Sequence, residues 1–259
     1  MSKIARIVGE PRFGGIMVVC DHGGRRVPEG LDLGIEEADM NQHIAYDIGV
    51  AEIAELMAEN PGTAAFIAEY SRLVVDLNRR ADDPAAIPER SDGRAIAGNA
   101  EIDRAARLME YHHPFHGELE RQLEATPPAL TVFLHSFTPR MATDDSERPW
   151  QCGVLYDHDD RGAMIAKRLL EEEGFLVGDQ QPYSGKALNA TMNRHAEANA
   201  IPYIGIEMRQ DLVGDAQDKS GSLTAKISMA PEAAPLIQAT LSLSLSSLMV
   251  SPFRWDFKI

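Results

Sequence analysis

The sequence lacks the features that mark secreted and membrane proteins. Cys20 and Cys152 are the only cysteines in 259 residues, too few for a disulfide framework, and we expect both to be buried free thiols. The N-terminus has no apolar signal segment. No apolar run approaches the ~20 residues that span a bilayer, and the nearest, residues 239–250, alternates Leu with Ser. These absences predict a cytoplasmic protein.

Basic residues are also scarce. Lys and Arg number 25 against 40 Asp and Glu, which gives a formal net charge of −15. Such a charge argues against nucleic acid or an anionic membrane as a partner. It does not exclude a small anionic substrate, because a local group of arginines acts at short range. The sequence does not indicate an oligomeric state.

Several catalytic motifs are missing as well. The chain contains no G-x-S-x-G, no P-loop and no G-x-G-x-x-G, so serine-hydrolase chemistry and nucleotide binding have no support from motifs. Ser136 follows His135 directly, but adjacent residues of an extended chain point to opposite sides and do not form a catalytic pair.

What the sequence does contain is an alternation of short apolar runs and longer amphipathic stretches. The runs predict strands at residues 15–20, 64–77 (one or two strands), 129–134, 151–155 and 203–208. The longer stretches predict helices at residues 39–59, 101–124 with a kink at Pro114, 160–173 followed by Gly174, and 222–247 (one or two). This alternation predicts a single α/β domain over residues 1–259, a three-layer α/β/α fold with a central mixed, mainly parallel sheet.

Polar residues with catalytic potential follow these predicted strands. His22 comes after the first strand, before two glycines that allow a close approach, and His135 follows the 129–134 strand. Glu207 lies late in an apolar strand. Strand ends in an open α/β sheet meet at one crevice. A zinc hydrolase takes three protein ligands and leaves a position for water, with a carboxylate as general base. The pattern indicates a metal site at His22 and His135, with Glu207 as the base.

A second group of residues favours binding of a carboxylate. Arg72, Asn78 and Arg79 lie on and just beyond the predicted 64–77 strand, and guanidinium groups bind carboxylates in bidentate fashion. The polar segment 78–97 that follows is long enough to indicate a functional loop.

Simpler interpretations stay open for each of these residues. A lone histidine in a loop is more often a hydrogen-bonding residue than a ligand, Glu207 could pair with Arg194 or Arg209, and Asn78 with Arg79 could form a surface turn. His112 and His116 are four residues apart and could share a helical face. Because Pro114 lies between them, we favour a structural role for the cluster of His112, His113 and His116. His195 is a plausible neighbour of the site.

Taken together, these segments resemble the N-formylglutamate amidohydrolase family, which is itself similar to zinc carboxypeptidases and aspartoacylases. The matching segments appear in family order over roughly residues 14–212: Asp21-His-Gly-Gly24 with Pro28, Tyr70-Ser-Arg-Leu-Val-Val-Asp-Leu-Asn-Arg79, Tyr111-His-His-Pro-Phe-His116, Leu134-His-Ser-Phe137 and Gly205-Ile-Glu-Met-Arg-Gln210. The second of these is the most specific.

The resemblance implies a metal-dependent hydrolase of amino-acid metabolism. Such an enzyme removes formate or another small acyl group from an acidic amino acid such as N-formylglutamate. His22 and His135 match the zinc ligands, Glu207 the catalytic carboxylate, and Asn78 with Arg79 the pair that holds the substrate carboxylate. Arg72 is expected to join that pair, and Arg209 to assist with a second acidic group.

One position departs from the wider group, because Arg25 stands where a ligating glutamate is usual. We expect Asp47 to be the third ligand, since members of the family tend to carry an aspartate there, with Asp21 as the alternative. A divalent metal other than zinc, a carboxypeptidase-like deacylase acting on a larger substrate, and a non-catalytic carboxylate-binding protein without metal remain competing hypotheses.

Overall fold

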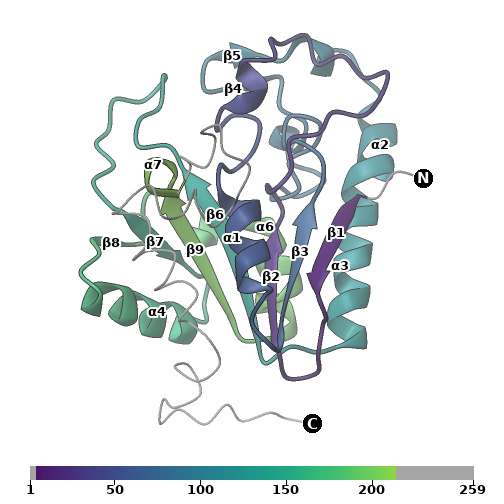
Figure 1. The fold of residues 1–259 in the computed structure, drawn as a ribbon. Helices are drawn as coiled ribbons and strands as arrows, with labels where there is room; N and C mark the ends of the chain where they lie inside the picture. The colour runs from purple at the N-terminus through teal and green to yellow at the C-terminus, as the bar shows by residue number, and fades with distance from the viewer. Residues whose placement is uncertain (1–3, 214–259) are drawn as a thin grey trace.

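The computed structural model describes residues 4–213, which form a seven-stranded sheet with helices on both faces (Figure 1). In spatial order the strands are β1 (Ala5–Gly9), β3 (Thr63–Ala68), β2 (Ile16–Cys20), β6 (Leu130–Phe137), β9 (Tyr203–Arg209), β7 (Cys152–Leu155) and β8 (Val177–Asp179). A separate two-stranded hairpin consists of β4 (Arg90–Ser91) and β5 (Arg94–Ala95).

The central strands are parallel, and the antiparallel pairings lie toward the edges. Strands β3, β2, β6 and β9 run in the same direction. At one edge β1 is antiparallel to β3, and on the other side β7 is antiparallel to β9 and parallel to β8. The prediction of a mixed, mainly parallel sheet is therefore confirmed.

Helices cover both faces of this sheet. They are α1 (Val50–Met57), α2 (Arg104–Arg107), α3 (His113–Ala125), α4 (Arg161–Glu172), α5 (Gly185–Leu188), α6 (Ala190–His195) and α7 (Gln210–Val213). Side chains alternate between the faces along each strand. On β6, Val132 and Leu134 join α1 and α4 in one apolar cluster, whereas Phe133 joins α3 and α6 in the other. The three-layer arrangement is as predicted.

The predicted helix at residues 39–59 is wrong in its first half. Only a 3₁₀ turn at Asp39–Asn41 and α1 from Val50 onward are helical. Gly49, immediately before α1, has a φ of +82°, and the backbone N–H of Asp47 bonds to the carbonyl of His22 at 2.9 Å. These contacts hold residues 42–49 outside a helix and bring Asp47 beside the end of β2.

The predicted strand at residues 64–77 is also too long. Strand β3 ends at Ala68, and the next residues form turns, with Val74 N–H bonded to Ser71 at 2.9 Å and Arg79 N–H bonded to Asp76 at 3.2 Å. The apolar side chains that suggested a strand are buried in the core near α3 rather than in a sheet ladder. Arg72, Asn78 and Arg79 therefore lie on a folded segment after β3.

The helix predicted at residues 101–124 consists of three pieces. Helix α2 passes into a π-helical segment, η4 (Leu108–His112), and then into α3. Pro114 lies at the start of α3, directly after the π-helical segment, and has no N–H to donate to a carbonyl of that segment. The expected irregularity is present, just before the proline.

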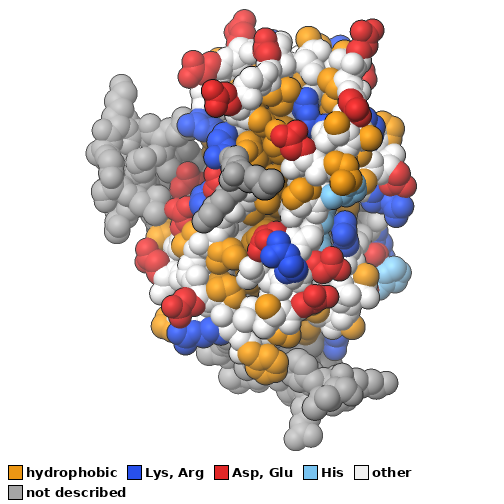
Figure 2. Space-filling model, turned by 90° about the vertical axis from the view of Figure 1, so that its right-hand side faces the viewer, with side chains coloured by type: hydrophobic (Ala, Val, Ile, Leu, Met, Phe, Trp, Pro, Cys, Tyr) orange, Lys and Arg blue, Asp and Glu red, His pale blue; other side chains and the backbone are white. Residues whose placement is uncertain are grey.

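Other predictions are confirmed with small shifts of boundary. Helix α4 is followed by Gly174 with a φ of +92°, and Cys20 and Cys152 are buried free thiols. The helices expected at residues 222–247 lie outside the described residues. Within residues 4–213 we find no helix with the length and apolar character that a membrane span requires. One face of the molecule carries acidic and basic side chains intermixed (Figure 2).

Candidate metal and active site

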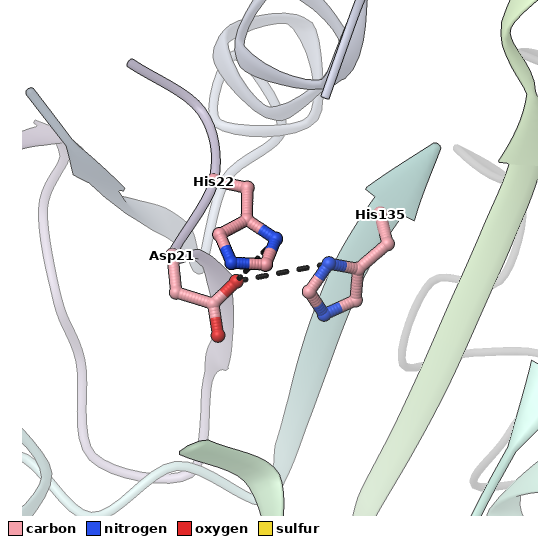
Figure 3. Close-up of side chains that lie close together, drawn as sticks. All are labelled: Asp21, His22 and His135. Atoms are coloured by element: carbon pink, nitrogen blue, oxygen red, sulfur yellow. Dashed lines mark ion pairs between the residues drawn. The ribbon is translucent and has the colours of Figure 1, made fainter. Parts of the chain in front are cut away.

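The carboxyl ends of β2 and β6 bring two histidines together. His22 follows β2, and His135 lies near the end of β6. Their ring centroids are 5.5 Å apart, and both residues are 3% exposed. Figure 3 shows the two imidazoles facing one space, with the carboxylate of Asp21 beside them. The central expectation from the sequence, that these histidines converge, is thus met by the structure.

Glycines after His22 allow this loop to pack closely against β3. A Cβ on Gly24 would lie 2.3 Å from the backbone of Glu69, and a Cβ on Gly23 would lie 2.7 Å from Ile67. No side chain fits such distances. The two glycines are therefore required for the backbone approach that aims His22 at the sheet end.

Two carboxylates complete the cluster. Nδ1 of His135 lies 2.9 Å from Oδ2 of Asp47 and 3.7 Å from Oδ1 of Asp21. Nδ1 of His22 lies 3.6 Å from Asp47 and 3.8 Å from Asp21. Ligand atoms around a tetrahedral zinc, each ~2.0–2.1 Å from the ion, are separated by about 3.3 Å. The atoms of Asp21, His22 and His135 have the spacing of a metal site.

The two carboxylates differ in their hydrogen bonds. Asp47 accepts from Arg72 at 3.2 Å and from the N–H of Ser136 at 3.3 Å, in addition to His135. Both oxygens of Asp21 are buried and have no hydrogen-bond partner among the described residues. A buried carboxylate without a donor is costly, so a cation near Asp21 would explain its place in the fold.

Asp76 and Arg72 lie behind the cluster and orient its side chains. Nε2 of His22 is 2.7 Å from Asp76, so this nitrogen carries the proton and Nδ1 is the one directed to the cluster. Arg72 forms ion pairs with Asp76, at 3.1 Å, and with Asp47, at 3.2 Å, and so connects the two carboxylates. In metal sites a ligating histidine usually donates its other ring N–H to a carboxylate, which fixes the orientation of the ring. Because Arg72 is engaged by two carboxylates, its position favours orientation of the site over direct binding of substrate.

The charges of the cluster match a divalent cation. Burial and Arg72 lower the pKa of His22, but Asp76, Asp21 and Asp47 outweigh them and raise it to about 9. Burial lowers the pKa of His135, but Asp21, Asp47 and Glu207 raise it to about 10. The surrounding carboxylates therefore stabilise two positive charges here. One divalent ion in place of two protons preserves the charge of the cluster, so the donor set fits zinc.

Glu207 lies beside this cluster on β9, and burial raises its pKa to about 7 against the opposing effect of His135. Its Oε2 is buried without a partner among the described residues. A carboxyl group with a pKa near neutrality is suited to accept a proton and return it.

These groups line a cavity of about 220 Å³, which we call the inner cavity. It brings together most of the site residues predicted from the sequence, namely His22, Asp47, Arg72, Asn78, Arg79, His135 and Glu207. Arg209 is not among its lining residues, because the Arg209 guanidinium is held by Asp211 at 2.8 Å and by the carbonyl of Pro149 at 3.4 Å. The structure thus does not bring Arg209 to the site.

Asn78 and Arg79 form one wall of the inner cavity. The Asn78 amide donates to Asn189 at 3.1 Å and accepts from the N–H of Thr191 at 3.1 Å. Arg79 is partly exposed and reaches the carbonyl of Leu188 at 3.3 Å. A carbonyl is a weaker partner for guanidinium than a carboxylate, so Arg79 is available to an anionic ligand.

The histidine cluster after η4 supports this wall from behind. His112 donates from Nε2 to the carbonyl of Arg79 at 2.9 Å, and His116 donates from Nε2 to the carbonyl of Leu77 at 3.1 Å. Nδ1 of His116 then accepts from Nε2 of His195 at 2.8 Å. These contacts agree with the structural role expected for His112 and His116, whereas His113 is exposed. His195 reaches the wall only through His116.

Some residues of the site had no signal in the sequence. Asn189, Tyr183 and the half-buried pair of His43 and Asp92, 3.1 Å apart, all line the inner cavity. They come from loops without a motif. Asp76 was visible within the Tyr70–Arg79 segment, but only the structure reveals that it supports His22.

A family model described as N-formylglutamate amidohydrolase matches residues 14–213. The chain belongs to the N-formylglutamate amidohydrolase family. Family membership supports a hydrolase acting on amides. A search of curated proteins gave no match.

Solved structures resemble this family member over nearly its whole length. A gene product of Agrobacterium tumefaciens is 27% identical with a TM-score of 0.79, covering 96% of this chain and 97% of that one. An N-formylglutamate amidohydrolase from Ralstonia eutropha is 17% identical with a TM-score of 0.60, covering 92% and 96%. At that identity the second likeness shows the common fold.

Proposed function

We propose that this chain is a zinc-dependent amidohydrolase that removes a formyl or similarly small acyl group from an acidic amino acid such as N-formylglutamate. The observation that carries the proposal is the convergence of two imidazoles and two carboxylates beside Glu207, in a cavity bordered by Arg79. Family membership supports the amide bond as the target.

The ion would be held by Nδ1 of His22, Nδ1 of His135 and carboxylate oxygens of Asp47 and Asp21. Asp47, the choice made from the sequence, lies nearer to both imidazoles. Asp21 is the carboxylate that lacks any other partner. A bound zinc ion lowers the pKa of its water to about 7 and polarises the scissile carbonyl.

Glu207 acts as general base and then as general acid. Its carboxylate takes the proton of the attacking water and delivers it to the departing amide nitrogen. Asp76 and Asp47, joined through Arg72, keep the imidazoles in place during these transfers. The buried surroundings of Glu207 let it hold a proton near neutral pH.

Arg79 binds the substrate carboxylate, with the remaining amide N–H of Asn78 beside it. A carboxylate replaces the Leu188 carbonyl as the partner of the Arg79 guanidinium. The inner cavity, at about 220 Å³, is smaller than the ~300–1,000 Å³ typical of pockets for drug-sized ligands. Such a volume suits a short acyl group on a single amino acid.

Zinc reconstitution tests this function. The metal-free protein is loaded with zinc and supplied with N-formyl, N-acetyl and peptidyl derivatives of acidic and neutral amino acids, and release of the free amine is measured. We expect activity on N-formyl or N-acetyl acidic substrates, loss on chelation and recovery on adding zinc. A zinc-loaded protein that cleaves no member of the panel, yet binds N-formylglutamate, would instead be a carboxylate-binding protein.

A further inference from the structure

A second and larger cavity adjoins the inner one. It has a volume of about 720 Å³, within the ~300–1,000 Å³ typical of pockets that enclose whole ligands. We call it the outer cavity. Asn78, Arg79, Leu188 and Asn189 line both cavities. A single short N-acyl amino acid fills the inner space and leaves the outer one without a role.

The boundary between the two cavities consists of weak contacts. Arg79 reaches the carbonyl of Leu188 at 3.3 Å, and Asn78 bonds to Asn189 at 3.1 Å. In the proposed function a substrate carboxylate takes the place of the Leu188 carbonyl at Arg79. Binding at Arg79 therefore loosens the boundary and joins the two spaces.

The outer cavity is locally cationic in a chain of net charge −15. Its lining includes Arg79, Arg80, Lys186 and Arg194 against Asp82 and Asp83. Arg80 is paired with Asp82 at 3.0 Å. Within residues 4–213, neither the Lys186 ammonium nor the Arg194 guanidinium has a hydrogen bond or an ion pair. Two cations are thus available to an anionic ligand.

The same cavity is lined by a buried hydrogen-bond acceptor that has no donor. His112 is 2% exposed, and its Nε2–H is used by the carbonyl of Arg79. Its Nδ1 is therefore the unprotonated nitrogen, and in the described part of the chain it has no partner. A buried acceptor is normally satisfied. Nδ1 has essentially no accessible surface in this structure, so a ligand N–H or O–H group in the outer cavity satisfies it only once the boundary has loosened.

We propose that the outer cavity binds a second acidic residue, so that the substrate is an N-acylated acidic peptide rather than a single amino acid. This inference rests on the proposed function, which places the scissile acyl group in the inner cavity. The side-chain carboxylate of the first residue lies at Arg79. The peptide N–H that follows donates to Nδ1 of His112, and the carboxylates of the second residue face Lys186 and Arg194.

Binding measurements on an inactive variant separate this inference from catalysis. In zinc-loaded Glu207→Gln, dissociation constants for N-formylglutamate and for the dipeptide N-formyl-Glu-Glu are measured by calorimetry. We expect the dipeptide to bind more tightly. Adding Lys186→Gln and Arg194→Gln should weaken its binding by about fivefold or more, as expected for two largely exposed pairs, and leave N-formylglutamate within twofold.

Salt and a distant charge provide the controls. Higher ionic strength should weaken dipeptide binding more in the protein that retains Lys186 and Arg194 than in the variant that lacks both. Arg168→Gln, on the exposed side of α4 and 3.0 Å from Glu172, should change neither constant. Equal affinity for the two probes, or a dipeptide constant unmoved by loss of Lys186 and Arg194, overturns the inference. Neither result bears on hydrolysis of N-formylglutamate by the wild type, which is scored separately.

Discussion

His135 and Glu207 are direct neighbours on the adjacent parallel strands β6 and β9. In a parallel pair, residues at the same level point to the same face, so both side chains lie on the face covered by α3 and α6, at the carboxyl end of the sheet. This register places the proposed base next to a proposed metal ligand. The strand pairing is thus a part of the active-site geometry.

The first prediction concerns Glu207 itself. Glu207→Gln keeps the size of the side chain but cannot take a proton. We expect kcat/KM on the best substrate to fall by ~10²–10⁴, with zinc content unchanged, measured by kinetics and metal analysis. Glu172→Gln, at the exposed end of α4, should leave both unchanged. Full turnover by Glu207→Gln would exclude Glu207 as the base.

The second prediction distinguishes the two carboxylates of the cluster. Asp21→Asn and Asp47→Asn should each weaken zinc binding by at least about tenfold, the lower range seen when groups supporting a metal are removed. Competition with a zinc chelator measures the affinity, and Asp159→Asn, at a surface pair with Arg161, serves as the control. If Asp21→Asn binds zinc like the wild type, Asp47 is the only carboxylate ligand.

The third prediction concerns recognition of the substrate carboxylate. Arg79→Gln removes the guanidinium, and KM for N-formylglutamate should rise by about tenfold, since a hydrogen bond to a charged group contributes ~1.5–3 kcal/mol. Arg80→Gln changes the adjacent arginine, which points to Asp82, and should leave that KM unchanged. The same KM in both variants would mean that groups other than Arg79 bind the substrate carboxylate.

Much of this site was predictable because the sequence reveals where strands end. The apolar runs before His22, His135 and Glu207 are true neighbouring strands of a parallel sheet, so their ends had to meet. The Asp47 prediction rested on family resemblance, and the structure places Asp47 in the cluster for a local reason. Its backbone bonds to His22, a contact that interrupts the helical pattern.

What could not be predicted depends on contacts between distant loops. Burial of Leu73 and Leu77 produced an apolar run that resembles a strand, although the backbone there turns. An apolar pattern indicates that a segment is buried, and a segment can be buried without forming the hydrogen bonds of a β-sheet. Likewise, the roles of Arg72 and Arg209 are decided by their nearest carboxylates, and the identity of a neighbour in space is absent from a single sequence.

The last prediction uses the buried histidines behind Arg79. Burial and neighbouring cations lower the pKa of His116 to about 2 and that of His195 to about 4, so both stay neutral in the folded protein. In the unfolded chain they gain protons below about pH 6.5. As pH falls from there toward about 4.5, the unfolded state binds protons that the folded state excludes. Each histidine then lowers the free energy of unfolding by about 1.4 kcal/mol per pH unit.

Urea unfolding of the chelator-treated protein between about pH 7 and about pH 4.5 measures this slope. The low pKa values of Asp47 and Asp76 act only near and below about pH 4, the range of free carboxyl groups, so they do not contribute. The raised pKa values of Glu207, His22 and His135 oppose the slope within this range, so the wild type is compared with a variant that lacks one of the two histidines. His195→Gln retains an N–H for Nδ1 of His116. It should reduce the dependence of the unfolding free energy on pH by the contribution of one titrating group, about 1.4 kcal/mol per pH unit. His158→Gln, whose side chain is 82% exposed, should not change it. Equal slopes for the wild type and His195→Gln would mean that His195 protonates without unfolding, and that the support behind Arg79 is looser than its hydrogen bonds indicate.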